Sequence, residues 1–147
     1  MPSTRNRVPV NTSEEVNRRI QRDIENNVEY FARHKGQIPA RLTELDQEWD
    51  IERAIEANAA ALGFAGVALG IMGNRRWLTL PAIVTGFLFQ HAMQGWCPPV
   101  PVLRRLGFRT AHEIEQERQA LKALRGDYEG VIEAKDQSAA ALQAARA

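Results

Sequence analysis

Two uncharged runs joined by a short polar turn decide the fold of this chain. Residues 57–73 read ANAAALGFAGVALGIMG, residues 74–77 read NRRW, and residues 78–93 read LTLPAIVTGFLFQHAM. Each run lies near the lower end of the roughly 17–25 apolar residues that a transmembrane helix needs. Two apolar helices connected by so short a turn form a helical hairpin. The sequence therefore predicts two membrane spans, over residues 57–73 and 78–96.

The first run favours a membrane because it is apolar on every side and rich in small residues. Its small residues, Ala59, Gly63, Gly66 and Gly70, form a predicted helix-packing seam. Gly66 and Gly70 have the GxxxG spacing, which lets helix backbones approach closely where lipid supplies no hydrophobic drive. Glycine at this density would weaken a helix in water by up to about 1 kcal/mol per residue relative to alanine. We therefore expect a homodimer or higher homo-oligomer held together through this seam.

Tryptophan and basic residues orient the predicted hairpin. Trp49 precedes the first run, and Trp77 and Trp96 stand at the two ends of the second, which is typical of residues at a membrane–water interface. The connecting turn carries Arg75 and Arg76. Six basic residues lie in the near flanks: Lys35, Arg41, Arg53, Arg104, Arg105 and Arg109. By the positive-inside rule, this excess predicts that both termini are cytoplasmic.

A soluble interpretation stays open beside the membrane interpretation. Both runs are short, Asn58 stands inside the first one, and the mean hydropathy of the whole chain is negative. In this interpretation the chain is a soluble α-helical oligomer. The hairpin then forms its core, covered by the flanking helices or by a second copy of the chain.

Amphipathic helices are expected on the N-terminal side of the hairpin. Residues 1–11 contain no long apolar run, so they are interpreted as a disordered leader and not as a signal peptide. An amphipathic helix is predicted over residues 12–36, where Thr12 and Glu15 have the spacing of a capping box. Its apolar residues recur at intervals of four and three: Val16, Ile20, Ile24, Val28 and Phe31. So narrow a stripe needs a partner helix or a membrane surface to cover it.

The hairpin region as a whole is assigned to residues 43–97, with a charged helix that begins at Thr43 and continues into the first span. Residues 98–147 are predicted to form an interfacial segment followed by C-terminal helices. In the interfacial segment, Arg104 and Arg105 are expected to meet lipid headgroups. Gly126 and Asp127 indicate a break in the C-terminal helices. The predicted fold is thus all-α: a short transmembrane helical hairpin flanked by amphipathic N-terminal and C-terminal helices.

Composition excludes several functional classes. Lys and Arg total 19 and Asp and Glu total 18, so no global field favours nucleic acid, and no nucleic-acid partner is expected. One cysteine excludes an intramolecular disulfide and a cysteine-rich zinc site. The histidines, His34, His91 and His112, lie far apart in sequence and lack metal-binding spacing. We therefore expect no metal, no cofactor and no catalytic residue.

The stretch QHAMQGWCPPVP, residues 90–101, contains the single cysteine, Cys97. Cys97 follows the C-terminal end of a predicted helix, whose dipole disfavours a thiolate. His91 lies six residues earlier and therefore on a different face of the helix. Gln90, His91 and Gln94 are instead predicted to make polar contacts between helices. A reactive thiol at Cys97, in a sulfur-carrier or redox role, is kept as an alternative function.

The hairpin and the ending Gly95-Trp96-Cys97-Pro98 together resemble the YgaP-like two-helix transmembrane family, a bacterial domain family of unknown function. The resemblance covers roughly residues 49–108 and rests on a first span rich in small residues, a second span and a glycine-x-cysteine-proline ending. It implies a location in the bacterial inner (cytoplasmic) membrane and pairing through the spans. Some members also carry a rhodanese domain, which handles sulfane sulfur, but no strand pattern for such a domain occurs here.

These patterns predict a membrane-bound structural or interaction module that self-associates through its helical hairpin and has no catalytic activity of its own. Its expected partners are the lipid bilayer, further copies of the chain and an unidentified protein.

Overall fold

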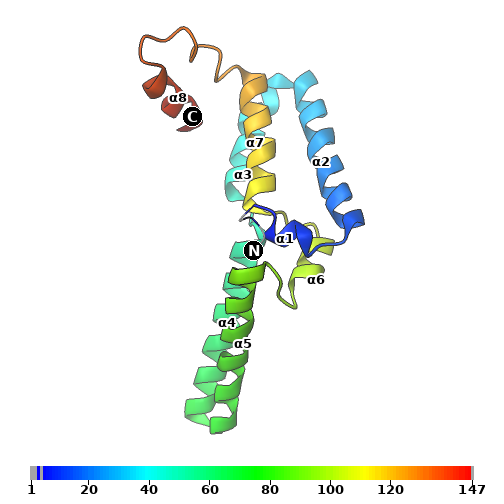
Figure 1. Ribbon diagram of the computed structural model, residues 1–147, viewed down its shortest axis with the longest axis vertical. Helices are drawn as coiled ribbons and strands as arrows, with labels where there is room; N and C mark the ends of the chain where they lie inside the picture. The colour runs from blue at the N-terminus through cyan, green and yellow to red at the C-terminus, as the bar shows by residue number, and fades with distance from the viewer. Residues whose placement is uncertain (1–2, 4, 147) are drawn as a thin grey trace. The chain divides into compact units, whose positions relative to one another are not determined.

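The chain is built from helices joined by turns and loops. The computed structural model describes residues 3 and 5–146, and no strand occurs among them (Figure 1). Two compact units are present. We call Met1–Gln21 with Trp49–His112 the hairpin unit, and Arg22–Glu48 with Glu113–Ala147 the flanking unit. The prediction of an all-α fold is confirmed.

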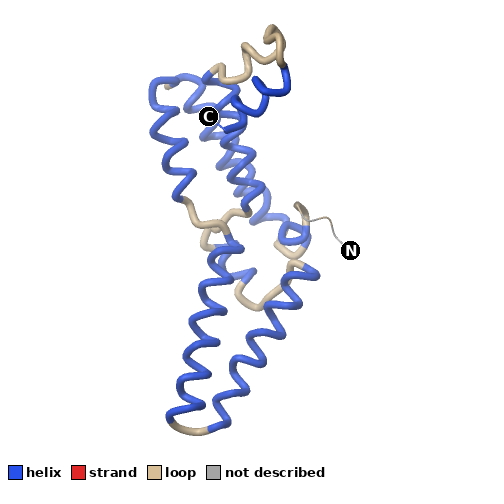
Figure 2. The backbone as a smooth tube through the Cα atoms, turned by 90° about the vertical axis from the view of Figure 1, so that its left-hand side faces the viewer, coloured by secondary structure: helices blue, strands red, loops and turns tan. Residues whose placement is uncertain are grey.

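Two antiparallel helices dominate the hairpin unit. α4 spans Ile51–Met72, a short 3-10 helix η2 spans Arg75–Leu78, and α5 spans Thr79–Gln94. The side chain of Asp50 accepts a hydrogen bond of 2.7 Å from the backbone N–H of Arg53, which caps the start of α4. In Figure 2 the two helices lie side by side and are joined by the loop at their lower end.

The two predicted spans do not appear as two helices of equal length. Among the described residues, one helical run, Lys35–Met72, is long and apolar enough to cross a membrane by length and composition. Its apolar part lies in α4. α5 has 16 residues, fewer than the roughly 20 that cross the hydrocarbon core of a bilayer. The structure therefore contains one apolar helix of spanning length, where the sequence predicted two spans.

Helix starts on the N-terminal side of the hairpin differ from those predicted. The structure has α2 over Glu14–Arg33, η1 over Lys35–Gln37 and α3 over Ile38–Gln47. Thr43 lies inside α3, where its hydroxyl donates to the Pro39 carbonyl, so the predicted helix start at Thr43 is wrong. Pro39 explains the earlier start, because proline fits the first turn of a helix, where no intrahelical donor is needed. Thr12 was predicted to cap the next helix, but its hydroxyl donates to the Val8 carbonyl at 2.9 Å, and α2 begins at Glu14.

A short helix, α1, occupies Arg7–Val10, where the sequence suggested a disordered leader. Val8 is buried in a core cluster with Ile51, Ile55, Cys97 and Val100. This apolar contact orders residues 7–10, and their disorder is therefore a wrong prediction. Residues 1, 2 and 4 of the expected leader lie outside the described residues.

α6, over Val100–Arg105, follows the two prolines after α5. Arg104 is fully buried: its guanidinium donates to the Asn17 side chain at 2.9 Å and to the Phe108 carbonyl at 3.2 Å. Arg19 donates to the Arg105 carbonyl at 2.8 Å and so satisfies an end group of α6. The prediction that Arg104 meets lipid headgroups is therefore wrong, because this side chain binds within the chain, whereas Arg105 is exposed.

The flanking unit contains a second core, formed mainly by α3 and α7 (Ala111–Arg125). Its buried residues are Ile38, Leu42, Leu45, Ile114 and Leu121, with Phe31 packed against them. The fully buried Glu117 accepts hydrogen bonds from Arg41 at 2.9 Å and from Asn27 at 3.3 Å. The end of the α2 stripe is therefore covered by the chain itself.

A break and a further helix follow α7. α7 ends at Arg125, and Gly126 has a φ of 93°, so the predicted break is confirmed. Lys122, buried in α7, donates to the Ala145 carbonyl of α8 (Gln137–Arg146) at 2.8 Å. This bond ties α8 to the flanking unit.

Candidate functional site at the base of the helical hairpin

Glycines bring α4 and the start of α5 into close contact near the connecting turn. A Cβ atom placed on Gly66 would lie 2.5 Å from Pro81 Cδ, and one on Gly70 would lie 2.6 Å from Leu78 Cδ2. A side chain at Gly66 would overlap the Pro81 ring, and one at Gly70 would require the Leu78 side chain to move. Two members of the predicted seam therefore pack within the chain. Gly63 has open space beside it, with no atom within 4 Å of such a Cβ.

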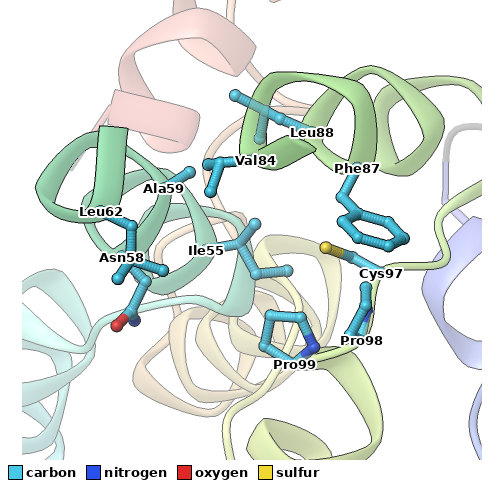
Figure 3. Close-up of a pocket in the computed structure, with 10 residues that line it drawn as sticks. All are labelled: Ile55, Asn58, Ala59, Leu62, Val84, Phe87, Leu88, Cys97, Pro98 and Pro99. Carbon is cyan, nitrogen blue, oxygen red and sulfur yellow. The ribbon is translucent and has the colours of Figure 1, made fainter. Parts of the chain in front are cut away.

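The two helices diverge from the turn towards the opposite end of the hairpin, which we call the base (Figure 2). There they enclose a pocket of about 220 Å³ (Figure 3). Four lining residues come from α4: Ile55, Asn58, Ala59 and Leu62. The remainder come from α5 and the segment after it: Val84, Phe87, Leu88 and residues 97–99. Asn58 directs its amide to the Ala54 carbonyl at 2.8 Å, so the walls are almost wholly apolar.

Cys97 lies in this pocket wall, with its sulfur directed into the space between Ile55 and Phe87 (Figure 3). Its residue surface is 5% exposed, and burial raises the pKa of its thiol above the ordinary value. The prediction that Cys97 follows a helix end is confirmed, because α5 ends at Gln94. Burial and the position after the C-terminal end of α5 both hold the sulfur in its protonated, weakly nucleophilic form.

Cys97 is expected to react slowly with a small maleimide near neutral pH. The raised pKa lowers the thiolate fraction, and burial restricts access, so we expect a rate at least roughly ten-fold below that of the unfolded chain. The measurement is the alkylation rate of this single cysteine with and without denaturant, between pH 7 and pH 9. Equal rates for the folded and unfolded chain would contradict the buried placement.

His91 lies elsewhere at the base, in a charged network with Glu52 and Arg7. His91 Nε2 is 2.5 Å from Glu52 Oε2, and Arg7 donates to the other carboxylate oxygen of Glu52 at 3.0 Å. Arg7 also donates to the Ala92 carbonyl at 3.1 Å. His91 is 3% exposed. This network connects α1, α4 and α5, and it leaves His91 in a structural role separate from Cys97.

The residues predicted to make polar contacts between helices behave differently from one another. His91 makes such a contact through its ring, to Glu52 on α4. Gln94 contributes its backbone carbonyl, which accepts from the Asn11 side chain at 2.8 Å. Gln90 is half-buried on α5. Arg7 and Glu52 were missed by sequence reasoning, since Arg7 is 85 residues from its Ala92 partner and lies in the expected leader.

The network determines the titration of Glu52, which lies outside the predicted spans. Burial by itself would raise the pKa of this carboxyl. The hydrogen bonds and positive charges of His91 and Arg7 outweigh burial and hold the pKa below its ordinary value. A lowered folded-state pKa means that the unfolded chain binds the proton more readily. The carboxylate therefore contributes to stability above the ordinary pKa, and this contribution is lost as the pH falls through the folded-state value.

Lowering the pH from 7 to about 3.5 is expected to reduce the free energy of unfolding of the wild-type chain more than that of the Glu52→Gln variant. The substitution removes the titrating group and therefore its share of the pH dependence. The measurement is the free energy of unfolding of both chains in the same micelles at each pH. Glu56→Gln, an exposed position one turn further along α4, is the matched control and is expected to keep the wild-type slope. A slope unchanged by Glu52→Gln would contradict this account.

The described residues contain no group of three His, Cys, Asp or Glu side chains placed to hold a metal ion. Comparisons of the chain with family models, curated proteins and solved structures found no match. The resemblance to the YgaP-like family therefore stays a prediction.

Proposed function

We propose that the chain is a membrane-anchored interaction module whose α4–α5 hairpin enters the lipid bilayer. The observation that carries this proposal is the exposure of the apolar stretch, of which only 17% is buried within the chain. The core helix of a soluble protein would be mostly covered. Six large apolar side chains of α4 are exposed: Leu62, Phe64, Val67, Leu69, Ile71 and Met72. A surface of this kind is typical of a membrane or protein contact.

The dimensions of the hairpin support insertion across the bilayer. α4 has 22 residues and its uncharged part covers residues 57–72, which at 1.5 Å per residue is about 24 Å, so this part together with the turn at Trp77 approaches the roughly 30 Å hydrocarbon core. Trp49 is 46% exposed just before α4, and Trp77 is 49% exposed at the turn. The Arg53 guanidinium lies 4.4 Å from the Trp49 ring centre. Aromatic and basic residues thus occupy both ends of the apolar stretch, as at two membrane interfaces.

The shorter α5 would cross together with its flanking turns. Arg75 and Arg76 in η2 are exposed at the turn, where long side chains reach the far headgroups. We propose the bacterial inner membrane as the location and the cytoplasm as the side of both termini. The greater number of basic residues in the flanks than in the turn supports this orientation.

Self-association is proposed to use the side of α4 that faces away from α5. Gly66 and Gly70 are occupied within the chain. On the other side, Ala57, Ala61 and Ala65 recur every four residues and are exposed. Small side chains at this spacing let a second helix approach closely in lipid.

Ala61→Leu should therefore lower the yield of crosslinked dimer, whereas Ala82→Leu, at an exposed position of α5, should leave it unchanged.

The test of the membrane proposal compares charge at exposed positions inside and outside the hairpin. Phe64 and Ile71 are 79% and 78% exposed, so a soluble fold would tolerate aspartate at either. In a bilayer, each aspartate costs up to about 2.5–3.5 kcal/mol. The double variant Phe64→Asp, Ile71→Asp should move the protein from the carbonate-resistant membrane fraction to the supernatant. Val10→Asp, at a position 70% exposed outside the hairpin, is the matched control.

Wild-type protein that carbonate extracts completely would overturn the proposal and favour the soluble oligomer. A thiol-dependent function at Cys97 is not favoured, since its burial and raised pKa are typical of a packing residue.

A further inference from the structure

We propose that the pocket at the base of the hairpin binds one acyl chain of a membrane phospholipid. This inference rests on the proposed insertion of α4 and α5 into the bilayer. The pocket lies wholly within the hairpin unit, between the two helices and the segment after α5. Its occupant follows from the chemistry of the walls, from the way in which the helices diverge and from the surface onto which the pocket opens.

The walls exclude a polar ligand or a stable water cluster. The lining side chains are aliphatic or aromatic apart from Asn58 and Cys97. The Asn58 amide donates to the Ala54 carbonyl, and a protonated thiol is only a weak hydrogen-bond donor. Ordered water needs two to four polar partners, and so apolar a lining favours apolar molecules over water. The occupant is therefore a hydrocarbon.

The hairpin geometry gives the pocket the form of a wedge. At Gly66 the helices touch, with the built Cβ only 2.5 Å from Pro81. Towards the base they diverge (Figure 2), and the buried Ile55 and Cys97 close the far wall. A wedge that is closed at the Gly66 contact and at Ile55 and Cys97, and open only at its side, admits a narrow chain more readily than a bulky ring system.

The opening of the wedge is continuous with the surface that the proposed function places against lipid. Leu62 and Phe87 belong to both the lining and the exposed surface, at 50% and 37% exposure. An acyl chain could therefore enter laterally, with no crossing of a polar layer. A void left empty would forfeit dispersion contacts for every lining group, which favours occupation.

The test is photolabelling of the full chain in vesicles of phosphatidylcholine that contain a small fraction of the same lipid with a diazirine on one acyl chain. Adducts are assigned to residues by mass spectrometry. Cys97 reports on the pocket, because its surface is only 5% exposed. Phe64 and Ile71 report on the outer surface of the hairpin. We expect adducts at Cys97 in addition to those at the outer positions.

Variants that fill the pocket test whether the labelled acyl chain reaches Cys97 through the pocket. Ala59→Phe places a ring in the pocket, and it should lower the Cys97 adduct at least five-fold while leaving Phe64 and Ile71 labelled. Ala60→Phe, on the exposed side of the same helix, is the matched control and should change neither signal. Val84→Phe fills the pocket from α5 and gives the same result if Ala59→Phe fails to insert.

The outcomes separate this inference from the proposed function. Labelling at Phe64 and Ile71 without labelling at Cys97 would overturn the acyl-chain site and leave membrane insertion standing. A Cys97 adduct that persists in both pocket-filling variants would also overturn the site. Absence of label at all three positions would overturn the site and membrane insertion together.

Discussion

Gly95→Ala is expected to destabilise the hairpin unit by about 3–5 kcal/mol. Gly95 has a φ of 75°, a conformation that costs an L-residue roughly 1–3 kcal/mol. A Cβ atom at this position would also lie 2.4 Å from the carbonyl carbon and oxygen of Arg7. The obstructing atoms are backbone, so the clash can be relieved only by displacing α1, which would break the bonds from Arg7 to Ala92 and Glu52.

Gly107→Ala separates the two contributions to this effect. Gly107 has a φ of 97°, yet no atom lies within 4 Å of a Cβ built there. The Gly107→Ala variant should therefore lose only the conformational part of the free energy of unfolding, roughly 1–3 kcal/mol. The measurement is the free energy of unfolding in urea, in micelles of one detergent, for both variants and the wild type. Equal losses for Gly95→Ala and Gly107→Ala would contradict the close packing of α1 against the end of α5.

Gly66→Leu is expected to open the helical hairpin. The Cβ alone would overlap the Pro81 ring and lie 3.1 Å from Leu80 Cβ, and the rest of a leucine side chain would force α4 and α5 apart. We expect a loss of about 3 kcal/mol or more in the free energy of unfolding, because neither helix can yield without losing the contacts of the whole interface. Hydrogen exchange of the amides near the turn should accelerate in parallel.

Gly63→Leu is the matched control, three residues earlier on α4, with nothing within 4 Å of the added Cβ. It should leave both measurements close to wild type. The pair also tests where the chain self-associates. If Gly66→Leu lowered the yield of crosslinked dimer while the stability of the isolated chain stayed unchanged, the GxxxG pair would be a contact between chains, and its assignment within the hairpin would be wrong.

The sequence was sufficient to predict the class of fold and the main helical regions. Uncharged runs, the four-residue polar turn and the apolar repeat of α2 are local patterns, and local patterns report helix formation directly. The narrowness of the α2 stripe also indicated correctly that a partner surface was needed. The structure supplies one for Phe31, among the core residues of α3 and α7.

Contacts between residues that are distant in sequence explain the predictions that were wrong. Arg104 looked like a headgroup ligand because two adjacent arginines follow an apolar helix, but its partner Asn17 lies 87 residues away. The network of Glu52, His91 and Arg7 joins three separate helices in the same way. The GxxxG spacing indicated close helix packing correctly, but spacing alone does not distinguish a partner helix in the same chain from one in another copy.

The position of α1 has a consequence for the order of folding during synthesis. α1 is synthesised before both apolar helices. Ala92 and Gln94, which accept hydrogen bonds from Arg7 and from Asn11 at the end of α1, are made more than eighty residues later. Val8 must therefore remain uncovered until both apolar helices have been translated. α1 therefore docks late, after the hairpin has formed. An intermediate with α1 undocked would be the species most open to chaperones and proteases.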